Sequence, residues 1–165
     1  MILFYSCSRE YDDDFENKDF YYKITSFTST QSLIDINNDG VINSNILLET
    51  TNYSSYPYDL EIKIKKSNDF ISFYLPFQNI MYDLNCCPNG FVEFSRNGFV
   101  IRLGKENHLI ENLIIDNENE VKHFSKISET KYKLILIKSY YDFNTSQIIN
   151  NEFEVIYEKV DTVSN

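Results

Sequence analysis

The sequence of 165 residues contains no tryptophan and no alanine, and it has only four glycines and three prolines. Alanine is the strongest helix former, so its absence disfavours a helical fold. Isoleucine, tyrosine, phenylalanine, valine and threonine, which favour strands, are plentiful. The composition therefore predicts a β-rich protein, and the length suits a single domain with a substantial core.

Basic residues are also scarce: 15 lysines and arginines stand against 25 acidic residues, a formal net charge of −10. A nucleic-acid backbone would be repelled by this charge, so the sequence predicts no nucleic-acid partner. Cations are compatible partners. The simpler interpretation, that the acidic surface only keeps the protein soluble, stays open.

Residue types that carry catalysis are few and scattered. The two histidines, His108 and His123, lie in polar stretches and are expected on the surface. The adjacent Cys86 and Cys87 lack the spacing of a zinc site, and are interpreted as loop cysteines that are reduced, joined to each other or paired elsewhere. No phosphate loop, dinucleotide fingerprint or zinc-protease motif is present. We expect no enzymatic activity.

Short β-favouring runs alternate with turn-like stretches along the chain. In residues 59–65 the alternation is strict and predicts Leu60, Ile62 and Ile64 on the core side. One helical turn is expected at 46–50, capped by Ser44 or Asn45. The expected strands cover residues 20–27, 59–65, 70–77, 91–95, 99–103, 109–115, 121–127, 132–139 and 153–159. This pattern predicts an all-β fold, a single antiparallel barrel or sandwich with at most one short helix, over residues 18–165.

Several connections are also predicted. The Asn97-Gly98 pair is typical of a type I′ hairpin turn, and Pro76 is expected to break its strand at an edge or an end. Residues 86–90 are expected to form a tight loop. Residues 121–127 are expected to pair back on 109–115, and a polar connection is expected at 142–151.

The first 17 residues have a different character from the rest. Residues 1–7 are apolar and end in Cys7, with the small Ser6 before it, and an acidic run follows at 12–14. This resembles the end of a bacterial lipoprotein signal followed by a hydrated tether. It predicts a lipid anchor on Cys7, a membrane partner and a location at the outer membrane or cell surface. The alternative is an ordinary cytosolic terminus with an incidental cysteine.

Oxygen-bearing side chains recur at alternate positions after the first expected strand. This layout is typical of a calcium loop, in which positions 1, 3, 5, 7 and 9 supply oxygen and a glycine permits the sharp turn after position 5. The residues that fit are Asp35, Asn37, Asp39, Gly40 for the turn, Val41 through its backbone carbonyl, and Asn43.

The end of this loop departs from the EF-hand pattern. Its twelfth position is Ile46, which has no side-chain oxygen, so Asn45 or Glu49 must close the site. With few carboxylates, the expected Ca²⁺ affinity is weak, about 10⁻⁴ to 10⁻³ M. Such an ion would staple the loop. The alternative is an Asx-rich turn that satisfies its own backbone without metal.

The Asp-x-Asn-x-Asp-Gly segment at 35–40, followed by Asn45-Ile46-Leu47-Leu48, resembles the lipocalin-like lipoproteins of Bacteroidetes. Asn45 stands where that family usually has an acidic residue. The resemblance implies a small β-barrel-like envelope lipoprotein, mostly without assigned activity. We expect it to bind a small ligand or a protein partner, with a structural assembly module, or an acidic-site hydrolase, as alternatives. Candidate ligand-facing tyrosines are Tyr53, Tyr56, Tyr58, Tyr74, Tyr82, Tyr140 and Tyr141.

Overall fold

The computed structural model describes residues 18–50, 53, 58–64, 70–83, 87–103, 110–113 and 119–160. They form one eight-stranded antiparallel sheet in the order β5-β4-β3-β2-β1-β8-β7-β6. The strands are β1 (Lys18–Ser29), β2 (Leu60–Ile64), β3 (Phe70–Asp83), β4 (Cys87–Leu103), β5 (Ile110–Leu113), β6 (Asn119–Ser128), β7 (Lys131–Asp142) and β8 (Gln147–Lys159), and the helical turn is α1 (Ile46–Glu49).

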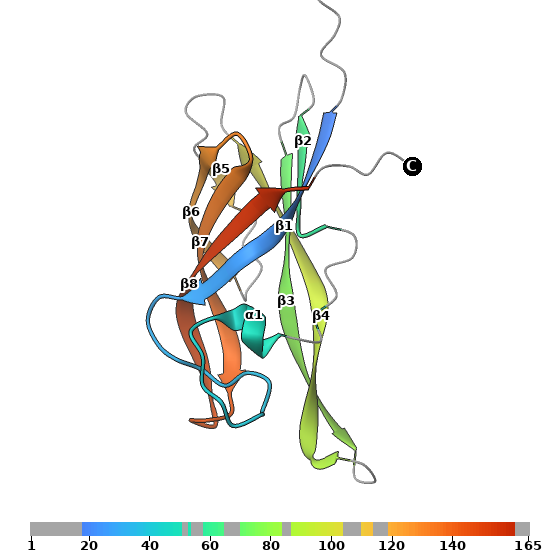
Figure 1. Ribbon diagram of the computed structural model, residues 1–165, viewed down its shortest axis with the longest axis vertical. Helices are drawn as coiled ribbons and strands as arrows, with labels where there is room; N and C mark the ends of the chain where they lie inside the picture. Colours follow the sequence, from blue (N-terminus) through green and yellow to red (C-terminus); the bar gives the residue numbers. More distant parts are fainter. Residues whose placement is uncertain are drawn as a thin grey trace, which may run out of the picture.

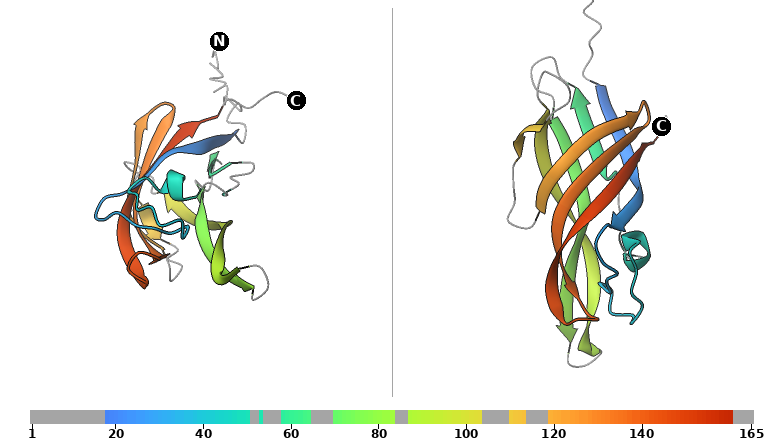
Figure 2. Two further views of the ribbon diagram at one scale, coloured as in Figure 1. Left: turned by 60° about the horizontal axis from the view of Figure 1, so that its bottom comes forward. Right: turned by 90° about the vertical axis from the view of Figure 1, so that its left-hand side faces the viewer.

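The sheet curls strongly into a half-barrel, as Figures 1 and 2 show. Its edge strands β5 and β6 approach each other, but no ladder pairing joins them among the described residues. The all-β prediction is confirmed. Because one curled sheet makes the whole core, the barrel-like alternative holds and the two-sheet sandwich does not.

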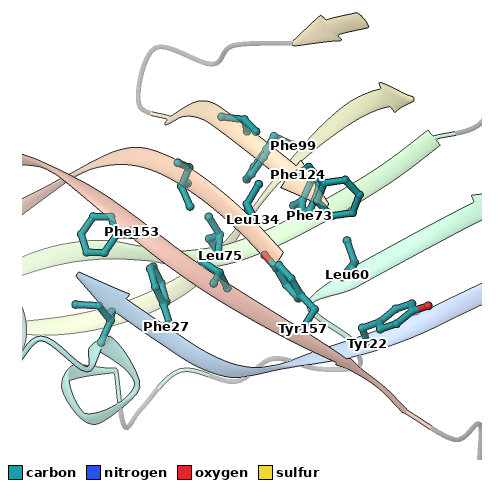
Figure 3. Close-up of a cluster of buried hydrophobic side chains, with 14 of the residues drawn as sticks. Tyr22, Phe27, Leu60, Phe73, Leu75, Phe99, Phe124, Leu134, Phe153 and Tyr157 are labelled. Carbon is teal, nitrogen blue, oxygen red and sulfur yellow. The ribbon is translucent and has the colours of Figure 1, made fainter. Parts of the chain in front are cut away.

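The concave side of the sheet is filled with aromatic and aliphatic side chains (Figure 3). Phe73 lies at its centre, with ring centroids of Phe99, Phe124 and Tyr157 at 5.2, 5.3 and 5.9 Å. Side chains on β7 alternate in burial from Lys133 to Asp142, as expected for one face on a core. The alternation predicted for β2 is confirmed at Leu60 and Ile62, which are buried.

Residues 97–98 lie inside β4, so the predicted hairpin turn there is wrong. β4 runs unbroken from Cys87 to Leu103, and Gly98 pairs with Tyr74 of β3. A Cβ added to Gly98 would lie 2.7 Å from Cε1 of Tyr74. The glycine therefore makes room for a ring on the neighbouring strand, a reason that the dipeptide alone does not reveal.

Four further features differ from expectation. β3 continues past Pro76 to Asp83, although Pro76 does lie beyond the stretch that β2 flanks, as an edge proline should. Residues 87–90 belong to β4 rather than to a loop. β6 pairs with β7 rather than with the 109–115 segment. β8 already begins at Gln147, because the 131–142 and 147–159 segments form a long, tightly connected hairpin.

Several predicted features lie outside the described residues: the tether 1–17 with Cys7, Cys86 and His108. Within the described part of the chain, no helix is long and apolar enough to cross a bilayer.

Candidate metal centre

The segment between β1 and α1 forms a loop that leaves the sheet and returns to it. Isolated antiparallel bridges join Thr28 to Asn45 and Ile34 to Asn43, so both ends of the loop are held together. Ile34, Ile36 and Ile46 are fully buried and pack into the main core. The apolar positions thus fix the loop to the sheet and leave its oxygen-rich side chains to converge on one another.

Three carboxylates meet in this loop. One oxygen each from Asp35, Asp39 and Glu49 lie within 4.8 Å of one another. Asp35 and Glu49 are buried, at 3% and 1% exposure, whereas Asp39 is exposed. Ca²⁺ binds oxygens at about 2.3–2.6 Å, so two oxygens on one ion can be at most about 5 Å apart. The three carboxylates satisfy that limit.

The first five positions of the loop are shaped by side-chain to backbone hydrogen bonds. Asp35 accepts from the amides of Asn38 at 2.8 Å and Gly40 at 3.1 Å. Asp39 accepts from the Val41 amide at 2.7 Å, and its own amide donates to Asn37 Oδ1. Gly40 has a φ of 82°, the conformation that its position was predicted to require. The loop therefore has the Asx-turn geometry of the metal-free alternative as well.

Glu49 closes the cluster, from the last position of α1. Its Oε2 accepts from the Ile36 amide at 3.1 Å, and its Oε1 accepts from Asn43 Nδ2 at 2.5 Å. Burial raises the pKa of Glu49, although the hydrogen bonds from Asn43 and Ile36 oppose that effect. The negative charges of Asp39 and Asp35 raise it further. A divalent cation between these groups would relieve the repulsion that the fold imposes on them.

The structure places the two residues that were expected to close the site differently. Asn45 is the N-cap of α1, where its Oδ1 accepts from the Leu47 amide at 3.1 Å. It is exposed and is not part of the acidic cluster. Val41 is also exposed, at 56%. Of the predicted metal-binding residues, Asp35, Asp39 and Glu49 are therefore brought together as carboxylates, with Asn37 and Asn43 bonded to them.

A residue that sequence reasoning missed anchors the loop to the far end of the sheet. Asp142 Oδ1 accepts from the Asp35 amide at 2.9 Å, and the Phe143 amide donates to the Asp35 carbonyl. Burial disfavours the charged form of Asp142, but hydrogen bonds from Thr145, Asp35 and Asn144 outweigh it and hold its pKa below the ordinary value. No local motif links positions so far apart in the sequence.

The other candidates lie elsewhere. His123 is exposed on β6, as predicted. The candidate tyrosines do not form one face: Tyr53 donates to Asp59, Tyr58 stacks on Tyr21, and Tyr74 lies under the Arg96 guanidinium. Tyr140 and Tyr141 share a cleft. Tyr56 and the side chain of Tyr82 fall outside the described residues.

Comparisons with protein-family models, with curated proteins and with solved structures found no match to this chain.

Proposed function

We propose that this chain is a cell-envelope lipoprotein of the lipocalin-like kind. In this proposal a lipid on Cys7 anchors it at the outer membrane or cell surface, residues 35–49 hold a structural Ca²⁺, and the β domain binds a small ligand or a protein partner. The observation that carries the calcium part is the convergence of Asp35, Asp39 and Glu49 within 4.8 Å.

The ion would act as a staple and not as a catalyst. The carboxylates come from two points on the loop, and the loop is bonded to the β7–β8 turn through Asp35. A cation held there would join the end of β1, α1 and that turn. Glu49 is only 1% exposed, so the fold has already removed its carboxylate from water. The ion would neutralise that buried charge.

Thermal unfolding in calcium and in chelator tests this proposal. With a Kd of about 10⁻⁴ to 10⁻³ M, 10 mM Ca²⁺ should stabilise the native state by about 1.4–2.7 kcal/mol. For a domain of this size that corresponds to a rise in Tm of about 3–10 °C. Asp39→Asn should abolish most of the rise, because Asp39 is exposed and its loss should leave the fold intact.

Asp19→Asn is the matched control, since Asp19 is an exposed aspartate on β1, away from the loop. It should keep the full rise. A Tm that is the same in calcium and in chelator contradicts the proposal, as does an equal rise in the Asp39→Asn variant or with Mg²⁺ at the same concentration.

The anchor rests on the sequence around Cys7 and needs its own test. The full chain, produced with its native upstream sequence in a bacterial host, should incorporate a labelled fatty acid and sediment with membranes. Cys7→Ser should lose both properties, and Cys87→Ser should keep them. Labelling that persists in Cys7→Ser would reject the anchor.

One observation favours the assembly module as the second candidate. The concave face of the sheet is packed with side chains such as Phe73, Phe99 and Tyr157, and is not an open calyx (Figure 3). A ligand would therefore have to bind outside this packed interior. If no small molecule binds, the assembly role becomes the better explanation.

A further inference from the structure

A cleft of about 440 Å³ lies between β3 and the β7–β8 hairpin, apart from the packed centre of the sheet. Phe77 and Ile80 of β3 form one wall, and Tyr140, Tyr141 and Ile148 form the other. Among the described residues, β6 pairs with β7 only as far as Lys138. The part of β7 that lines the cleft, Ser139 to Tyr141, follows this last pair.

Gln78 keeps the two walls at a fixed separation. Its side-chain amide accepts from the Tyr141 amide at 2.8 Å and donates to the Tyr141 carbonyl at 3.0 Å. It thus takes the place of a neighbouring strand at that residue. Tyr140 Oη donates to the Pro76 carbonyl at 2.8 Å, which makes a second tie between β7 and β3. The cleft is therefore built into the fold rather than left by a loose side chain.

Three of the polar side chains along the cleft are already engaged with the protein. Gln78 and Tyr140 are bonded as described, and Ser139 Oγ donates to Asn150 Oδ1 at 2.5 Å. No charged residue lines the cleft. The Lys138 ammonium lies 5.1 Å from the Tyr140 ring centroid, but its side chain is buried and bonded to Asn119. What the cleft offers a ligand is aromatic and aliphatic surface.

We propose that this cleft binds a neutral, apolar small molecule with a flat aromatic or aliphatic face. The Lys138 ammonium near the Tyr140 and Phe77 rings is already bonded to Asn119, so a charged ligand would lose water and meet no charged side chain in the lining. A sugar would leave most of its hydroxyls unpaired. The net charge of −10 further disfavours anions. The volume lies within the range of small-molecule sites, about 300–1,000 Å³. Ile148, which is 72% exposed, gains an apolar contact when the site is filled.

This inference deepens the small-ligand part of the proposed function and rests on it, while it requires neither calcium nor the anchor. N-phenyl-1-naphthylamine is a suitable probe because it is neutral and its fluorescence rises in apolar sites. The absence of tryptophan leaves only weak tyrosine emission to subtract. We expect saturable binding at one site, and weaker binding of the anionic 1-anilinonaphthalene-8-sulfonate.

Ile148→Ser and Ile127→Ser form a matched pair of variants. Both isoleucines are exposed, at 72% and 53%, but Ile127 lies on β6, outside the cleft. Ile148→Ser should weaken probe binding by about five-fold or more, because a buried methylene contributes about 0.8 kcal/mol. Ile127→Ser should bind the probe as the unmodified chain does, and both should melt cooperatively.

Each failure has its own signature. Equal losses in both variants, or tighter binding of the anionic probe, overturn the cleft as an apolar site. Binding of a neutral sugar in place of the probe overturns only the ligand class, whereas no saturable binding by any of these molecules also removes the small-ligand function. The titrations are run in calcium and in chelator, and the Tm shift needs no probe, so failure of the calcium loop is recognised separately.

Discussion

At the scale of single residues, two buried tyrosines show how differently a hydroxyl can be placed in one core. Tyr140 and Tyr157 are 2% and 0% exposed. The Tyr140 hydroxyl donates to the Pro76 carbonyl at 2.8 Å, whereas the Tyr157 hydroxyl has no hydrogen-bond partner among the described residues. Burial raises the pKa of both, so both stay protonated. The Tyr157 hydroxyl thus carries a desolvation cost that no bond offsets.

Replacement of each tyrosine by phenylalanine should separate these two cases. Tyr157→Phe should leave the free energy of unfolding unchanged or raise it by up to about 1 kcal/mol, since an unsatisfied hydroxyl is removed. Tyr140→Phe should lower it by about 1 kcal/mol, because the Pro76 carbonyl loses a donor. Urea denaturation measures both. If Tyr157→Phe is as costly as Tyr140→Phe, its hydroxyl has a partner such as an internal water.

The sequence predicted local arrangements of residues better than distant ones. The alternate oxygens of Asp35, Asn37 and Asp39 were recognisable because a loop of that spacing turns its side chains toward one centre. The contribution of Asp142 was not, because it depends on how the β7–β8 hairpin meets the loop. Asn45 was one of the two caps expected for the helical turn, and the structure makes it the N-cap of α1, while Glu49 lies with the two aspartates.

At the scale of elements, β4 shows that a dipeptide typical of turns can lie inside a strand when the neighbouring strand requires a glycine. Asn97 and Gly98 sit in extended backbone opposite Leu75 and Tyr74. The Arg96 guanidinium lies 3.5 Å from the centroid of the Tyr74 ring, which covers Gly98. The ring thus occupies the space that a side chain at 98 would need.

Gly98→Ala should therefore lower the free energy of unfolding by about 1–2 kcal/mol, because its Cβ would collide with the Tyr74 ring. In a Tyr74→Ala background the sign should reverse. There the same change should stabilise by about 0.5–1 kcal/mol, since glycine is unfavourable in a strand that has no close approach. The two backgrounds are compared by chemical denaturation, and the same sign in both would mean that the ring is not the cause.

At the scale of the whole molecule, the β3–β4 hairpin is supported unevenly. β2 pairs with β3 only over Phe70–Phe73, and β5 pairs with β4 only over Ile101–Leu103. In the described part of the chain, the rest of the hairpin is therefore a two-stranded ribbon, which extends past the other strands in Figure 1. Two strands alone are marginally stable in water.

Amide hydrogen exchange should reveal this difference. Amides at residues 79–81 and 91–93 should exchange through local opening, with protection well below that of residues 134–136 and 153–155 in the middle of the sheet. Pulse labelling read by mass spectrometry or NMR would measure it. Uniform protection across these segments would show that the ribbon opens only with the whole domain.

The class of fold followed from composition and alternation, and the strand order did not. The run 59–65 carries a clear period of two, which is typical of a half-buried strand. Which strands become neighbours depends on pairings between distant segments, such as β1 with β8. The filling of the concave face by Phe73, Phe99 and Phe124 is likewise set by that pairing.

β6 ends the sheet, and its pairing with β7 shifts register twice, between Val121 and His123 and between Lys126 and Ser128. Lys122 and Lys126 are exposed along it. A margin with two interruptions and two cations cannot offer the straight row of amides on which another chain would polymerise. Two molecules that meet along β6 should therefore separate again, so the sheet can stay open at this edge without seeding fibres.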